Sequence, residues 1–229
     1  MKRLREFVRK GSPAEVSARL VLLQGELEQL AAALWQRTDM GEAARVLPGL
    51  LRCSARQVDI VDRSGPLPVE VAAGACRTAF ETNLRARIVT SDPGRMLQMS
   101  IERLSDEKSF LNSQLNLLQR GVTPEDLQPL RDRIAFLEDV QRRRDLADVK
   151  PPRVVDLARE AGRLDDHRTI YGLYSKYVHA SGWLICTEPH NRDDPDIRNL
   201  FILETQVSAV DTLACIRDFV ASHQSETTT

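Results

Sequence analysis

The sequence has few lysines and almost no net charge. Its 229 residues combine 32 Lys and Arg with 33 Asp and Glu, for a formal net charge of −1. A chain this close to neutral has no general field that would attract nucleic acid or anionic lipid. Nearly all positive charge is arginine, whose planar guanidinium binds carboxylates and phosphates through two N–H groups. Local anion sites are therefore still compatible with the composition. Lysine occurs only at Lys2, Lys10, Lys108, Lys150 and Lys176.

Closely spaced cysteines and long apolar runs are also missing. Cys53, Cys76, Cys186 and Cys215 lie far apart, without the paired spacing of a zinc site, so we expect no metal and no cofactor. No apolar run approaches the roughly 20 residues of a membrane span. The basic start MKRLREFVRKGS has no apolar core or small-residue cleavage site, unlike a secretory signal. We therefore expect a cytoplasmic protein without a membrane segment.

Apolar residues recur at helical spacing along the chain, and strand-like alternation is absent. Ser12, Pro13 and Glu15 form a helix start with an N-cap, a first-turn proline and a capping box. Pro48 lies inside a second helical pattern and predicts two pieces or a kink. The prediction is an all-α multi-helix bundle, with residues 1–229 forming a single domain. The expected helices cover about 12–37, 42–62, 69–91, 93–120, 123–148, 153–161, 165–182 and 197–223.

Residues 93–149 differ from the rest because they are highly charged and have weaker apolar stripes. Gly121 separates two helical patterns, which predicts an antiparallel helical hairpin with a short turn. This hairpin either projects as an arm or lies flat on the core. At the other end, residues 224–229 are polar and are expected to form a disordered tail.

One stretch, DDHRTIYGLYSKYVHASG at 165–182, combines aromatic residues with an arginine, a serine and a histidine. On a regular helix, Arg168, Ser175 and His179 fall within about 40° of one another. Tyr171 and Tyr174 flank this stripe. Such an apolar helix is expected to be buried, so its polar groups need partners elsewhere in the chain. His167, beside two aspartates near the helix start, indicates a capping role rather than a ligand.

The expected partners lie on the helix at 69–91. Its first turns carry small residues, which allow another helix to approach closely and suggest a central position. Arg77, Glu81 and Arg85 then repeat every four residues, a spacing at which arginine and glutamate can pair. The two segments together predict a polar site.

Two interpretations of this site stay open. Histidine exchanges protons near neutral pH, and an adjacent arginine can hold a phosphate and stabilise developing charge. Alternatively, Arg77 and Glu81 form an ion pair that fixes helix register, Ser175 bonds the carbonyl of Tyr171, and His179 either caps its helix or bonds Glu81. The candidate catalytic residues are His179, Arg77, Glu81 and Ser175, and the candidate substrate-binding residues are Arg168, Tyr171, Tyr174 and Arg85.

The segments CRTAFETNLRARIVTSDP and YGLYSKYVHAS resemble an uncharacterised bacterial all-helical family. Its members carry an Arg-x-x-x-Glu helix followed by a Tyr/Leu-Ser-x-x-x-His helix. The resemblance covers roughly residues 45–220 and rests on these two motifs. It implies that Arg77, Glu81, Ser175 and His179 match the polar positions of the family, and it implies no established activity.

The chain is more loosely similar to the HEPN superfamily of helical bundles, many of them metal-independent ribonucleases of toxin and anti-phage systems. Their Arg-x(4–6)-His motif is usually completed across a dimer, whereas ten residues separate Arg168 from His179 here. This similarity implies RNA cleavage or RNA binding of host-defence or toxin type. The expected partners are RNA, a protein encoded nearby and, from the long amphipathic helices, a second copy of the chain. The alternative is a non-catalytic interaction or regulatory module.

Overall fold

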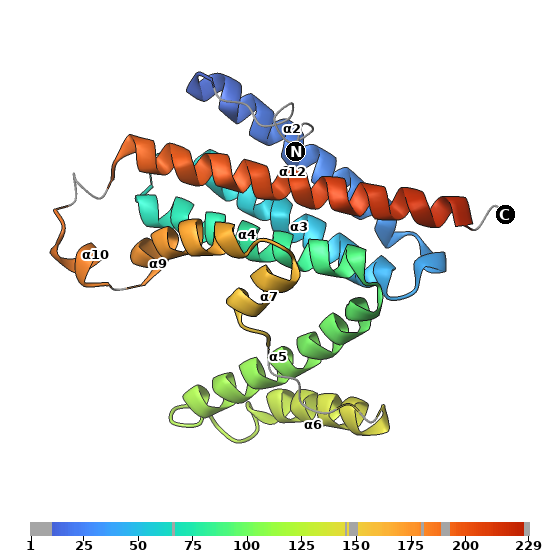
Figure 1. Cartoon of the computed structure of the whole chain (residues 1–229). Coiled ribbons are helices and arrows are strands. Elements are labelled where there is room, and N and C mark those ends of the chain that lie inside the picture. The colour runs from blue at the N-terminus through green and yellow to red at the C-terminus, as the bar shows by residue number, and fades with distance from the viewer. Residues whose placement is uncertain are drawn as a thin grey trace. The chain divides into compact units, whose positions relative to one another are not determined.

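The computed structural model describes residues 11–65, 67–144, 146, 151–179, 181–188 and 193–226. Across these residues the chain is helical, with turns between helices and no strand (Figure 1). This confirms the predicted all-α class. The chain divides into two compact units: unit 1 combines Met1–Pro93 with Val154–Thr229, and unit 2 is Gly94–Arg153.

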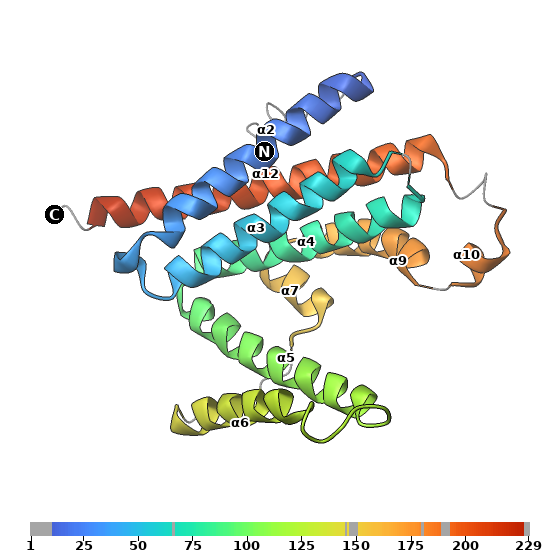
Figure 2. The ribbon, with the colours of Figure 1, turned by 180° about the vertical axis from the view of Figure 1, so that it is seen from behind.

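Unit 1 is built around α4. Helix α3 packs against both α2 and α4, and α12 packs along α4 and α3, while α7 and α9 also lie against α4 (Figures 1 and 2). The elements are α2 (Pro13–Trp35), η1 (Thr38–Met40), α3 (Ala43–Arg63), α4 (Val69–Ser91), α7 (Val154–Glu160), α8 (Leu164–Asp166), the π-helical turn η2 (His167–Tyr171), α9 (Gly172–Val178), α10 (Gly182–Cys186) and α12 (Pro195–Glu226).

Local signals in α2 and α3 had different outcomes. The capping box at the start of α2 is confirmed: the Ser12 N–H donates to Glu15 Oε2 at 2.9 Å, and the Glu15 N–H donates to Ser12 Oγ at 3.4 Å. At Pro48 the predicted division into two pieces does not occur, because α3 is one helix. Proline removes only one helical hydrogen bond, and α3 is held on several sides by α2, α4 and α12.

The core of unit 1 explains how distant segments meet. The small residues Ala72, Ala73 and Cys76 of α4 are at most 1% exposed, as their close-packing role predicts. Beyond them, the Phe80 and Phe201 rings each lie 6.4 Å from the ring of Tyr174 on α9, measured between centroids. This aromatic packing holds α9 against α4. Burial also raises the pKa of the Cys76 thiol, which therefore stays protonated as a small apolar group.

Unit 2 confirms the predicted charged hairpin. It consists of α5 (Gly94–Leu118) and α6 (Gln128–Arg143). Lys108 Nζ donates to Gln141 Oε1 at 3.0 Å, and Arg133 Nε donates to Glu107 Oε1 at 2.8 Å, so polar contacts join the two antiparallel helices. Helix α6 begins later than the predicted 123, because the residues before it form turns.

Two further predictions concern membranes and the C-terminal end. In the part of the chain that the structure describes, no helix is both long and apolar enough to cross a bilayer. Helix α12 continues to Glu226, so the first residues of the predicted tail 224–229 are helical. Residues 227–229 lie outside the described residues.

The helix predicted over 165–182 is present from Leu164 to Val178, but it is not one regular α-helix and it ends earlier than expected. It consists of α8, the π-helical turn η2 and α9 in direct succession. A π-helical turn holds an additional residue, so side chains on either side of it are offset by about 100° from regular helical positions. His179 then has extended backbone angles, with φ −107° and ψ 150°. Both features change which side chains of this segment face α4.

Candidate functional site

Arg77 joins the two segments that the sequence predicted to meet. Its Nε donates to Glu81 Oε1 at 2.9 Å, one turn along α4. Its Nη1 lies 3.1 Å from Nε2 of His179, which is 102 residues away in the sequence. Its Cζ lies over the ring of Tyr171, 5.1 Å from the centroid. We call Arg77, Glu81, Tyr171 and His179, together with His167, the Arg77 cluster.

The contact between Arg77 and His179 shows which nitrogen of the imidazole faces the guanidinium. A guanidinium only donates hydrogen bonds, so in this contact Nε2 of His179 is the acceptor. His179 is exposed, and the Arg77 and Glu81 side chains are 25% and 31% exposed. An external ligand can therefore reach both the imidazole and the guanidinium.

His167 belongs to this cluster, although its sequence context indicated a capping role. Its ring stacks on that of Tyr171, with centroids 4.6 Å apart and 17° between planes. Burial lowers the pKa of His167, and nearby Arg168 lowers it further, while Glu81 partly opposes the shift. These effects favour a neutral imidazole near neutral pH. The spacing of four residues between His167 and Tyr171 was the one signal that could have indicated the contact.

The electrostatics of the cluster keep Arg77 charged and Tyr171 protonated. The hydrogen bond that Arg77 donates to Glu81 raises the pKa of Arg77. Burial raises the pKa of Tyr171 and outweighs the opposing effect of the Arg77 charge. The phenol is therefore a hydrogen-bond donor at neutral pH rather than a nucleophile.

Three predicted site residues lie elsewhere. Ser175 Oγ donates to the carbonyl of Gly172 at 3.2 Å, a local bond within α9. Arg168 is 70% exposed and lies 3.5 Å from Asp165, because η2 removes it from the face that carries His179. Arg85 is partly buried further along α4.

Tyr174 lies in the core of unit 1, where a substrate cannot reach it. Its side chain is fully buried, and its ring packs edge-on against that of Tyr171 at 5.6 Å. Its hydroxyl has no hydrogen-bond partner among the described residues, and burial raises its pKa. The Tyr174 ring therefore contributes apolar packing, and it contacts the core-facing side of the Tyr171 ring.

Replacing Tyr174 tests this placement. An unsatisfied buried hydroxyl costs about 1–3 kcal/mol, so Tyr174→Phe is expected to raise the free energy of unfolding by about 1 kcal/mol. Tyr174→Ala removes the whole ring and is expected to lower it by about 3–5 kcal/mol. Urea unfolding of the two variants measures both effects. A loss of stability in Tyr174→Phe would show that the hydroxyl has a partner after all.

A second polar group, centred on Asp211 of α12, lies deeper in unit 1. Asn83 Nδ2 donates to Asp211 Oδ2 at 2.8 Å, and Arg87 donates to both of its carboxylate oxygens at 2.5 and 2.8 Å. Arg163 Nη1 lies 3.8 Å from the same carboxylate. The Asp211 side chain is 8% exposed, so these partners compensate a buried charge. We call Asp211, Asn83, Arg87 and Arg163 the Asp211 network.

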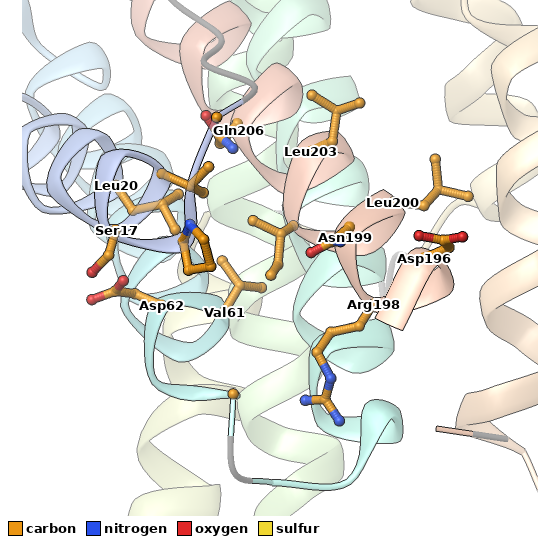
Figure 3. A pocket seen from close by; sticks show the side chains of 15 residues that line it. Ser17, Leu20, Val61, Asp62, Asp196, Arg198, Asn199, Leu200, Leu203 and Gln206 are labelled. Carbon is orange, nitrogen blue, oxygen red and sulfur yellow. The ribbon is translucent and has the colours of Figure 1, made fainter. Parts of the chain in front are cut away.

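A pocket of about 640 Å³ occupies another part of unit 1 (Figure 3). It lies between the first turns of α2, the end of α3 and the first turns of α12, and no residue of the Arg77 cluster lines it. Its walls include Leu20, Val61 and Leu203, with Asp62 and Asn199 among the polar residues (Figure 3).

In the described chain, no three His, Cys, Asp or Glu side chains gather as metal ligands would.

Comparison with known proteins places the Arg77 cluster in a shared domain. The model of a family of unknown function, DUF5677, matches residues 69–197, which is more than half of the chain. The chain belongs to the DUF5677 family. This confirms the predicted membership of an uncharacterised family, and every residue of the Arg77 cluster lies in the DUF5677 region. Asp211 and most of the pocket lining lie outside it. No curated protein and no solved structure matches the chain significantly.

Proposed function

We propose that the Arg77 cluster binds RNA at a phosphodiester and cleaves it without a metal ion, in a cytoplasmic HEPN-like protein of host-defence or toxin type. One observation carries the proposal: the exposed imidazole of His179 has Nε2 at 3.1 Å from the guanidinium of Arg77, although the two residues are 102 positions apart. Such a pair supplies a proton acceptor and a phosphate-binding cation in one place. Glu81 keeps the guanidinium in position through its 2.9 Å bond.

Phosphate binding would activate the base. When the Nη1 group of Arg77 donates to a non-bridging phosphate oxygen instead of His179, Nε2 of the imidazole becomes free to accept a proton. His179 then takes the proton of the ribose 2′-hydroxyl, and the 2′-oxygen attacks phosphorus. The bond from phosphorus to the 5′-oxygen breaks, and this oxygen takes a proton from water. The hydroxide so formed takes the proton from the His179 imidazolium, which returns the base to its starting state. The products are a 2′,3′-cyclic phosphate and a 5′-hydroxyl end, and Arg77 stabilises the charge that develops on phosphorus oxygens.

The test is an analysis of RNA ends after incubation with the purified chain in excess EDTA. Wild type is expected to leave 2′,3′-cyclic phosphate and 5′-hydroxyl ends. His179→Gln is expected to lower the cleavage rate at least about 100-fold, the usual contribution of a general base. His223→Gln is the matched control, because His223 lies on α12 against Phe219. Absence of cleavage by wild type, or equal cleavage by His179→Gln, would contradict the proposal.

A non-catalytic module is the second candidate, and one observation favours it. Arg77 contacts Glu81 on its own helix and both Tyr171 and His179 on the neighbouring segment, so it connects α4 to η2 and the end of α9. In such a module the cluster serves only to hold these elements together. His179→Gln would then lower the unfolding free energy in a protein whose wild type has no effect on RNA.

We also propose that the chain self-associates and acts with a protein encoded nearby. Exposed apolar side chains on the long helix α2, namely Val21, Leu22 and Trp35, support self-association, because a second copy could cover them. Light scattering after size exclusion measures this directly. A strictly monomeric protein at high concentration would count against it.

A further inference from the structure

The short connection between α7 and α8 directs the side chain of Arg163 toward the interior of unit 1. Gly162 has a positive φ of 68°, a conformation that glycine adopts without strain and that commonly ends helices. The next residue donates its N–H to the carbonyl of Ala158 at 2.7 Å, which closes the end of α7. After this turn the Arg163 side chain is only 14% exposed.

The Arg163 guanidinium contacts three separate elements. On α4, its Nη1 donates to Asn83 Oδ1 at 3.0 Å, and its Cζ lies 5.7 Å from the centroid of the Phe80 ring. On α12, Nη1 lies 3.8 Å from Asp211 Oδ2. Within its own segment, Nε donates to Asp166. One mostly buried side chain, 14% exposed, therefore fixes the start of the α8–η2 segment against both α4 and α12.

The same residue is linked to the Arg77 cluster. The carbonyl of Arg163 accepts a hydrogen bond from the N–H of His167 at 3.0 Å, and Asp166 directly precedes His167. Phe80 packs on Tyr174, whose ring in turn meets that of Tyr171. Both the backbone and the aromatic core thus connect the position of Arg163 to the His167–Tyr171 turn.

We infer that Arg163 is the positioning residue of the Arg77 cluster, holding the His167–Tyr171 turn at the depth where Tyr171 meets Arg77. Any effect on RNA cleavage rests on the proposed function, but the effect on the turn does not. Arg87 is the natural comparison. It bonds the same Asp211 carboxylate at 2.5 and 2.8 Å, and in the described part of the chain its side chain makes no bond to the α8–η2 segment.

The experiment compares Arg163→Met with Arg87→Met by NMR of the histidine rings, without RNA. In wild type, stacking on Tyr171 is expected to shift the His167 ring protons upfield, and burial is expected to keep the titration midpoint of His167 below its ordinary value of about 6.5. Arg163→Met is expected to lose the upfield shift and to move the midpoint up toward that value. Arg87→Met is expected to keep both signals, although each variant removes one guanidinium from Asp211 and loses stability.

Two results would overturn the inference: an unchanged His167 stacking shift in Arg163→Met, or an equal change in Arg87→Met. If Arg163→Met does not fold, Arg163→Lys provides the test, because lysine keeps the charge but cannot bond Asn83 and Asp166 with one planar group. In Arg163→Lys the upfield shift of the His167 ring protons is expected to decrease, but by less than in Arg163→Met. An upfield shift equal to that of wild type contradicts the inference. Where wild type cleaves RNA, Arg163→Met should lower the rate about 10- to 100-fold by misplacing the cluster. If wild type does not cleave RNA, the NMR result still decides the role of Arg163.

Discussion

Replacing Arg77 with alanine is expected to lower RNA cleavage by about 100- to 1000-fold while leaving the fold intact. The large kinetic effect is expected because, in the proposed mechanism, the guanidinium is the cation that stabilises charge on the phosphate. The small structural effect follows because Arg77 and Glu81 are partly exposed, and such ion pairs contribute less than about 1 kcal/mol. Single-turnover cleavage and urea unfolding measure the two effects on the same preparation.

Two other variants separate the role of the guanidinium from that of charge alone and provide a control. Arg77→Lys keeps a positive charge, but lysine cannot reproduce the fork that donates to Glu81 and His179 together, so cleavage should stay well below wild type. Arg168→Ala is the control, because the structure places this exposed residue beside Asp165. The opposite pattern for Arg77→Ala, a stability loss of several kcal/mol in a protein without effect on RNA, would support the non-catalytic module.

Asp211→Ala is expected to cause a large loss of stability in unit 1, about 3–5 kcal/mol. The substitution leaves the charges of Arg87 and Arg163 without their shared carboxylate and takes an acceptor from Asn83. Removing one partner of a buried ionic group costs this much because the remaining charges stay poorly solvated. The free energy of unfolding in urea, monitored by circular dichroism, is the measurement.

Glu26→Ala provides the matched control for this prediction. Glu26 also lies between two arginines, with Arg19 and Arg217 each 3.4 Å from one of its oxygens, but its side chain is 32% exposed. Because solvent screens this group, the expected loss is below about 1 kcal/mol. Similar losses for Asp211→Ala and Glu26→Ala would show that the Asp211 network does not act as a buried ionic group.

Local sequence signals predicted much of the helical fold and part of the site. The Ser12–Glu15 capping box and the helix at Val69–Ser91 are as expected, because their determinants lie within a few residues of one another. The four-residue spacing of Arg77 and Glu81 likewise produced the expected pair. The approach of His179 to Arg77 was also anticipated, from the apolar character of both helices.

Other features depend on packing that no short segment encodes. The η2 turn shifts the helical register, so Arg168 and Ser175 do not share the face of His179 and instead bond within their own segment. The bond between Asn83 and Asp211 joins residues 128 positions apart, and neither has a distinctive local context. Pro48 was expected to divide α3 or to kink it, and the division does not occur, because neighbouring helices support α3 around this residue. Tertiary contacts determined each of these outcomes.

The central claim is that an RNA phosphate binds where Arg77 meets His179. The most direct test is an NMR titration of the histidine rings with an RNA oligonucleotide whose 2′-hydroxyls are methylated, so that it binds without being cleaved. The account predicts that the ring signals of His179 and His167 shift in a saturable manner, that His223 on α12 does not, and that Arg77→Ala abolishes the response. Unchanged His179 and His167 signals at saturating RNA, or equal shifts at His223, would contradict the account.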